Sequence, residues 1–256
     1  MSASELPANP SELPRAARGV LVLVAAVIAA TWFVTWWTGA DYSGLLMMQL
    51  AGAAPTNLLL FFALSGVMMV AMMLPSAMPM VADYRGLASV EAGTKEGRAR
   101  TGIFTAGYFL VWTGFAAVSL VLLSALGFMG GMAGPWRYVP GVLLVAMGFY
   151  QLTAWKQLCL RRCRTPTSFV LTHWKRGRGG ALRMGLDHAT YCLGCCWLLM
   201  LVLFVAGAMS ILWMGVFSVL ILGEKLWSAG ERFSKAIGGT GIVVGCLALT
   251  LAGLGL

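Results

Sequence analysis

Soft metal-ligand side chains are concentrated in one short segment of this 256-residue sequence. Within nine positions the chain places one of its two histidines and three of its six cysteines: His188, Cys192, Cys195 and Cys196. Positions 188, 192 and 195 follow the i, i+4, i+7 pattern that puts side chains on one face of a helix. Because thiolate and imidazole groups bind soft and borderline metal ions, this spacing predicts metal or redox chemistry.

A second cysteine pair lies at the far end of the basic segment that precedes this cluster. Cys159 and Cys163 have i, i+4 spacing and would share a helical face if the helix continues to Arg164, with Pro166 ending it soon after. We therefore expect two helix ends on one side of a membrane to present five cysteines to a shared ion. The spacing differs from the paired CxxC units of zinc fingers.

Methionine provides a further set of soft ligands. Six methionines fall within the thirteen positions from 68 to 80. Thioethers suit Cu(I), and we take Met72 as the candidate ligand because the nearby Pro75 removes a backbone hydrogen bond and could open a local cavity. Methionine also packs helix interfaces well, so the same stripe is open to interpretation as core.

Two charged residues interrupt an apolar segment later in the chain. Glu224 and Lys225 precede Trp227, and one interpretation places all three at the membrane surface, with the charges solvated and the tryptophan in the aromatic belt. The other gives Glu224 a functional partner, such as an arginine of the basic segment 156–183, because a carboxylate inside a membrane is costly.

The composition indicates a polytopic membrane protein. The chain is 59% hydrophobic and only 11% charged, with a mean hydropathy of +0.83, whereas soluble proteins carry about 25% charged residues. The net charge of +9 falls in segments between apolar runs, so we interpret it as a topology signal and expect no nucleic acid as a partner. We expect a disordered cytoplasmic tail over residues 1–19 and a single transmembrane helical domain over residues 20–256.

The predicted fold class is all-α, a polytopic membrane helix bundle of about seven transmembrane helices. The expected spans cover residues 20–37, 57–80, 101–128, 139–157, two halves of 188–227 divided near 207–210, and 236–254. The division follows because one helix over 188–227 would be about 60 Å long, twice the thickness of the hydrocarbon core. A six-span alternative leaves the cations at 225, 232 and 235 outside, contrary to the positive-inside rule.

This topology places the cysteines in a reducing compartment. The N-terminus is expected in the cytoplasm and the C-terminus in the periplasm, so the two cysteine segments lie at cytoplasmic helix ends and are not expected to form structural disulfides. Asp187 is expected to cap the helix that carries Cys192. The start of that helix and nearby cations would then favour the thiolate, which is the metal-binding form.

The two cysteine motifs, Cys-Leu-x-x-Cys-Arg and Tyr-Cys-x-Gly-Cys-Cys-Trp, resemble those of a known family. Together with segments 67–76 and 223–225, they are similar to a bacterial domain-of-unknown-function family described as predicted metal-binding integral membrane proteins. The resemblance covers roughly residues 57–240 and implies a bacterial inner (cytoplasmic) membrane setting. Ala189 stands where the family usually has glycine, a change that removes no ligand.

The leading functional hypothesis is an inner-membrane protein that binds a soft metal ion, copper(I) first, for handling, transfer or insertion. The favoured ligands are Cys159, Cys163, Cys192, Cys195 and Cys196, with His188 and Met72 as secondary ones. Zinc is the alternative metal, because four thiolates suit it equally well. Besides the lipid bilayer, a metallochaperone or other membrane subunits are the expected partners.

Two rival functions remain open from the sequence. Cys192 and Cys195 form a CxxC pair that a membrane thiol/disulfide oxidoreductase could use. Alternatively, the chain is a non-catalytic subunit of a larger membrane complex, with structural cysteines. We expect a binding protein rather than an enzyme, because no phosphate-binding loop, HExxH motif or nucleophile elbow is present.

Overall fold

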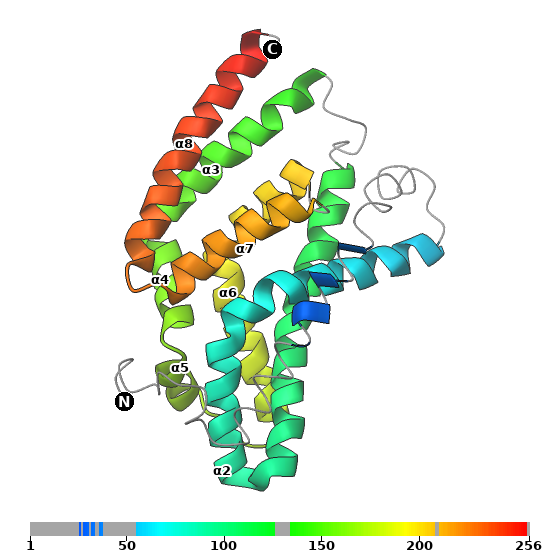
Figure 1. Ribbon diagram of the computed structural model, residues 1–256, viewed down its shortest axis with the longest axis vertical. Coiled ribbons are helices and arrows are strands. Elements are labelled where there is room, and N and C mark those ends of the chain that lie inside the picture. Colours follow the sequence, from blue (N-terminus) through cyan, green and yellow to red (C-terminus); the bar gives the residue numbers. More distant parts are fainter. Residues whose placement is uncertain are drawn as a thin grey trace.

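The computed structural model describes residues 26, 28–30, 32–33, 36–37, 55–125, 134–207 and 210–254, and the regular elements of these residues are all helices. The expected all-α class is therefore confirmed. The expected tail at residues 1–19 and most of the first expected span, 20–37, lie outside the described residues. Figure 1 shows a lower half built from α2, α5 and the start of α6, and an upper arm formed by α3 and α8.

Helix α2 (Pro55–Ala125) is a hairpin of two helical arms. The chain reverses at Gly93, where φ is 78° and ψ is 168°, a conformation that glycine adopts without steric cost. The descending arm contains Pro75 and Pro79. The second expected span, 57–80, and residues 101–125 of the third expected span, 101–128, therefore lie on opposite arms of this one element.

A sharp bend separates α3 (Val139–Leu152), which follows the short 3-10 helix η4 (Gly134–Tyr138), from α4 (Ala154–Arg164). The two helices meet at 68°. Thr153 is extended at the bend and its side chain accepts a hydrogen bond from the Lys156 backbone, so it starts a new helix as an N-cap. A straight span over 139–157 is therefore wrong. Helix α5 (Pro166–Thr172) follows directly.

Helix α6 (Gly177–Gly207) and helix α7 (Ile211–Leu226) confirm the break expected near 207–210. The start of α6 was placed wrongly, because the helix begins at Gly177 rather than at Asp187. Asp187 lies inside the helix, and its carboxylate pairs with Lys175 at 3.1 Å. The cysteines of α6 consequently lie in the middle of a long helix and not in its first turns.

Glycines bring α8 (Gly230–Leu254) against α3 along the upper arm. A Cβ atom on Gly148 would lie 2.6 Å from the Gly238 carbonyl oxygen, and one on Gly245 would lie 2.9 Å from the Gly141 carbonyl oxygen. Only glycine permits backbones to approach this closely, as is common between membrane helices.

Three described helical segments are long and apolar enough to cross a membrane: Gly66–Ser119, Gly177–Val205 and Gly230–Leu254. The number becomes four if the bent pair of α3 and α4 is one span. The expected seven spans, and the alternative of six, are thus corrected to three or four for the described part of the chain. Helix α7, at 16 residues, is shorter than the roughly 20 residues that a span requires. The two arms of α2 are counted as a single segment, Gly66–Ser119.

Candidate metal centre

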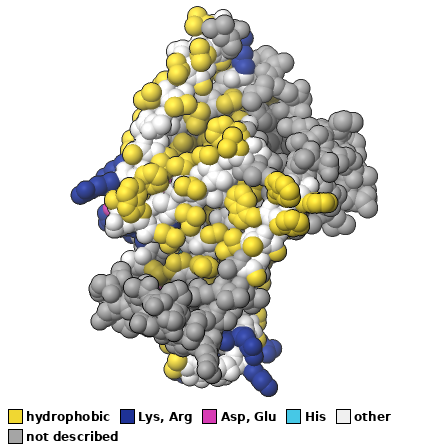
Figure 2. Space-filling model, in the orientation of Figure 1, with side chains coloured by type: hydrophobic (Ala, Val, Ile, Leu, Met, Phe, Trp, Pro, Cys, Tyr) yellow, Lys and Arg dark blue, Asp and Glu magenta, His cyan; other side chains and the backbone are white. Residues whose placement is uncertain are grey.

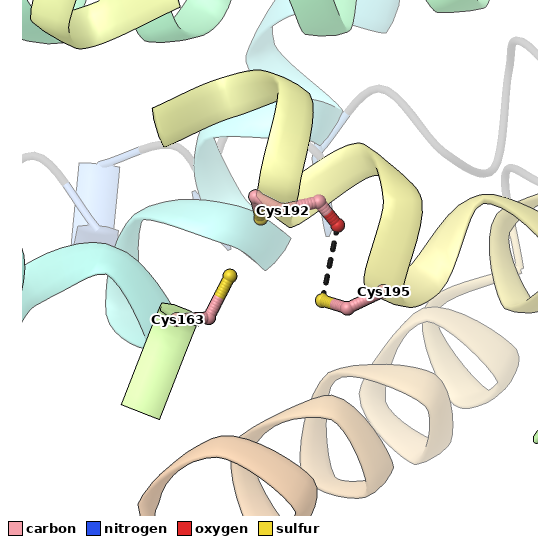
Figure 3. Close-up of side chains that lie close together, drawn as sticks. All are labelled: Cys163, Cys192 and Cys195. Carbon is pink, nitrogen blue, oxygen red and sulfur yellow. Dashed lines mark hydrogen bonds between the residues drawn. The ribbon is translucent and has the colours of Figure 1, made fainter. Parts of the chain in front are cut away.

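Three cysteine sulfurs from two helices converge in the middle of the molecule. The Sγ atoms of Cys163, Cys192 and Cys195 all lie within 4.8 Å of one another. Cys163 belongs to the last turn of α4, and its side chain points toward the stretch of α6 that carries the other two (Figure 3). Cys192 and Cys195 are buried, and Cys163 is partly exposed as a whole residue although it belongs to the buried sulfur group.

Local helix geometry and the bend at Thr153 together produce this arrangement. Cys192 and Cys195 are three residues apart on α6, so they lie on one face. The Sγ of Cys195 donates to the carbonyl oxygen of Cys192 at 3.0 Å, as the dashed line in Figure 3 shows. The bend after α3 gives α4 its own direction, and α4 packs against α6 with Cys163 near its end.

Cys192 has a positively charged neighbour from another helix. The Lys225 ammonium of α7 lies 2.9 Å from the Cys192 Sγ and 3.0 Å from the Ser76 hydroxyl of α2. The Tyr108 hydroxyl lies 3.0 Å from the same sulfur. A cation beside a thiol favours the thiolate. The expected nearby cation is therefore present as Lys225, whereas the expected contribution from the start of α6 is absent because Cys192 lies in the middle of that helix.

Glu224 is buried in an ion pair rather than solvated at the membrane surface. It is 1% exposed, and its carboxylate accepts hydrogen bonds from Lys156 at 2.6 Å and from Gln151 at 2.6 Å. The interpretation that gave Glu224 a partner within 156–183 is thus correct, although the partner is a lysine. The Lys156 ammonium also donates to the carbonyl oxygen of Cys195. The pair therefore joins α4, α6 and α7 beside the sulfurs.

Cys159 and Cys196 lie beside the three-sulfur group without joining it. A Cβ atom on Gly194 would lie 2.8 Å from the Cys159 Sγ, so the glycine of the motif leaves room for this sulfur. The Sγ of Cys196 donates to the Cys192 carbonyl oxygen at 3.0 Å. The sixth cysteine, Cys246 on α8, is exposed.

His188 is buried one helical turn before Cys192, among aromatic rings. Its ring stacks on Tyr108 with centroids 5.4 Å apart and meets Phe169 edge-on at 5.5 Å. Its Nδ1 has no hydrogen-bond partner in the described part of the chain. Tyr108, on which the His188 ring stacks, contacts the Cys192 sulfur, so His188 lies next to a residue that touches the site.

Met72 lies in the same buried cluster as the site cysteines. The methionines of this cluster, all at most 4% exposed, come from four helices: Met68, Met69, Met72, Met73, Met147, Met200 and Met214. They give the sulfurs an apolar surrounding, and both a ligand role and a packing role suit this position.

The donor set suits a soft ion of low coordination number. Three thiols in an apolar surrounding with a neighbouring ammonium are a set that favours Cu(I). A structural zinc site has four ligands, and in the described residues no fourth His, Cys, Asp or Glu joins the group.

Comparison with known proteins supports a copper-related role. A family model described as "PpoB2: Copper chaperone" matches residues 62–248. This stretch contains the five candidate cysteines, His188 and Met72. No curated protein and no solved structure matches the chain.

Proposed function

The chain belongs to the PpoB2 copper chaperone family, and we propose that it carries copper(I) as its cargo at Cys163, Cys192 and Cys195. The observation that carries this proposal is the convergence of three sulfurs from α4 and α6 within 4.8 Å. Cys159 and Cys196 are further thiols close to this group, and His188 and Met72 are secondary ligands. Zinc is the alternative cargo.

We infer that the protein works as a multi-pass protein of the bacterial inner membrane. Large hydrophobic side chains are exposed on α3 and α8, among them Val142, Phe149, Val243 and Leu247. On the face drawn in Figure 2, hydrophobic side chains spread across the described surface while Lys and Arg lie toward its margins. The proposed orientation keeps the N-terminus in the cytoplasm and the C-terminus in the periplasm, and it requires an odd number of spans. A metallochaperone or another membrane subunit would exchange copper with the site.

The geometry favours metal binding over thiol/disulfide exchange. An oxidoreductase needs a thiolate that its substrate can reach, but Cys192 and Cys195 are 0% and 1% exposed. Both also lie inside one continuous helix. A role as a non-catalytic subunit with structural cysteines predicts that replacing Cys192 changes assembly while leaving copper binding intact.

A Cu(I) competition titration tests the proposal. The purified protein, reduced and free of metal, is titrated with Cu(I) against a chromophoric Cu(I) chelator. We expect the wild type to bind Cu(I) and Cys192→Ser to lose at least the roughly 10–100-fold in affinity that loss of an outer-shell partner costs, because a direct ligand is removed.

The matched control for this titration is Cys246→Ser. It also removes one thiol, but from an exposed position on α8 outside the three-sulfur group, so it should bind copper as the wild type does. A wild type that fails to compete for Cu(I) would overturn the proposed function, as would equal losses in both variants.

A further inference from the structure

Lys225 is a buried cation whose negatively charged partner is not a carboxylate. It is 5% exposed, and its ammonium contacts the Ser76 hydroxyl and the Cys192 sulfur. The neighbouring carboxylate of Glu224 is directed to Lys156 on α4. Within the described residues, Lys225 makes no ion pair with Asp or Glu. A buried charge must be paired, so the thiolate of Cys192 is the group that can balance Lys225.

The net charge of a metal complex at this site depends on Lys225. A Cu(I) ion held by two thiolates carries a single negative charge, and the Lys225 ammonium makes the buried group neutral. The methionines around the site are at most 4% exposed, and their neutral side chains do little to balance a charge on the metal complex. In a low-dielectric interior an uncompensated charge is costly, so a neutral complex is favoured over a charged one.

We propose that Lys225 is the built-in counter-charge of the site and makes it accept a monovalent ion on two thiolates, one of them Cys192. This inference rests on the proposed copper function and adds a specificity-determining residue to it. A divalent ion on the same two thiolates would leave a net positive charge beside Lys225. The residue therefore favours Cu(I) over Zn(II) at this coordination number.

Lys225→Gln is the variant that isolates the charge, because glutamine keeps a hydrogen-bond donor for Ser76 and Cys192. We expect Cu(I) affinity to fall about tenfold or more, because a neutral donor replaces a charged one and hydrogen bonds between charged groups are the stronger by about this factor, and the preference for Cu(I) over Zn(II) to fall with it. Lys225→Arg keeps the charge and should retain most of the affinity. The control is Arg161→Gln, which removes a cation that pairs with Glu231 at the exposed surface, and it should change neither value.

The outcomes separate this inference from the proposed function. A wild type that binds no Cu(I) contradicts the function itself. If the wild type binds Cu(I) and Lys225→Gln has the same affinity and the same metal preference, the counter-charge role of Lys225 is overturned while the proposed function stands. X-ray absorption at the copper edge of the wild type gives a second measurement that needs no variant. Two thiolate ligands are expected, with the third cysteine of the group present as a neutral thiol, and a three-thiolate Cu(I) site would contradict the charge balance.

Discussion

At the scale of single residues, one glycine lets a cysteine and a helix backbone approach each other beside the site. Gly194 faces the Cys159 sulfur, and its carbonyl oxygen accepts a hydrogen bond from the Tyr150 hydroxyl. Both contacts join the α3–α4 segment to α6. The glycine of the Cys-Leu-Gly-Cys-Cys motif therefore has a packing reason that is separate from the ligands on either side of it.

Gly194→Ala should lower stability because its new methyl group would lie 2.8 Å from the Cys159 sulfur. Overpacking of this kind costs about 1–3 kcal/mol, measurable as a lower midpoint in thermal or denaturant unfolding. Gly102→Ala is the matched control, since nothing lies within 4 Å of a Cβ there and alanine is the better helix former by about 0.5–1 kcal/mol. Equal or opposite shifts would show that the close approach of α4 and α6 does not constrain position 194.

At the scale of elements, the end of α7 holds both cysteine-bearing helices. Adjacent residues do this in different directions: Glu224 pairs with Lys156 on α4, and Lys225 contacts Cys192 on α6. The Arg164 guanidinium adds a hydrogen bond to the Glu224 carbonyl oxygen at 3.1 Å. The register between α4 and α6, and hence the distance between their sulfurs, depends on these charges.

Breaking the buried pair should be far more damaging than breaking an exposed one. Lys156→Met leaves Glu224 buried without its cation, at a cost of about 3–5 kcal/mol. The double variant Lys156→Met, Glu224→Gln removes both charges and should lose less than the sum of the single changes. Unfolding midpoints of Lys156→Met, Glu224→Gln and the double variant give the coupling free energy between the two residues. Arg161→Gln, which breaks an exposed pair, is expected to cost only about 0–1 kcal/mol. Strict additivity would mean that Lys156 and Glu224 contribute no pairwise interaction to stability.

The sequence predicted the elements whose signals are local. The helices, the break near 207–210 and the shared face of Cys192 and Cys195 follow from length and periodicity. The start of α6 was missed because Asp187 is a good cap by type, although the segment 181–184 before it, Ala-Leu-Arg-Met, continues as helix. The contacts of Lys225 were missed for a different reason. Lys225 and Ser76 are 149 positions apart, and such a contact leaves no periodic signal.

At the scale of the whole molecule, long apolar helices enclose a small charged and sulfur-rich centre. The upper pair of α3 and α8 is held by glycine contacts and exposes hydrophobic side chains. The lower hairpin of α2 carries surface ion pairs, such as Glu96 with Arg178 at 3.1 Å. The three sulfurs lie in a buried cluster to which α2, α3, α4, α6 and α7 all contribute. Copper bound there would join α4 to α6 inside this cluster.

The copper content of Cys163→Ser tests most directly the claim that α4 and α6 share one ion. Cys163 is the only member of the described three-sulfur group on α4, so its loss leaves the pair on α6 intact. After equilibration with Cu(I) and removal of weakly bound metal, elemental analysis should find one copper per wild-type chain and per Cys246→Ser chain, and clearly less in Cys163→Ser. Full copper retention by folded Cys163→Ser would contradict the shared site.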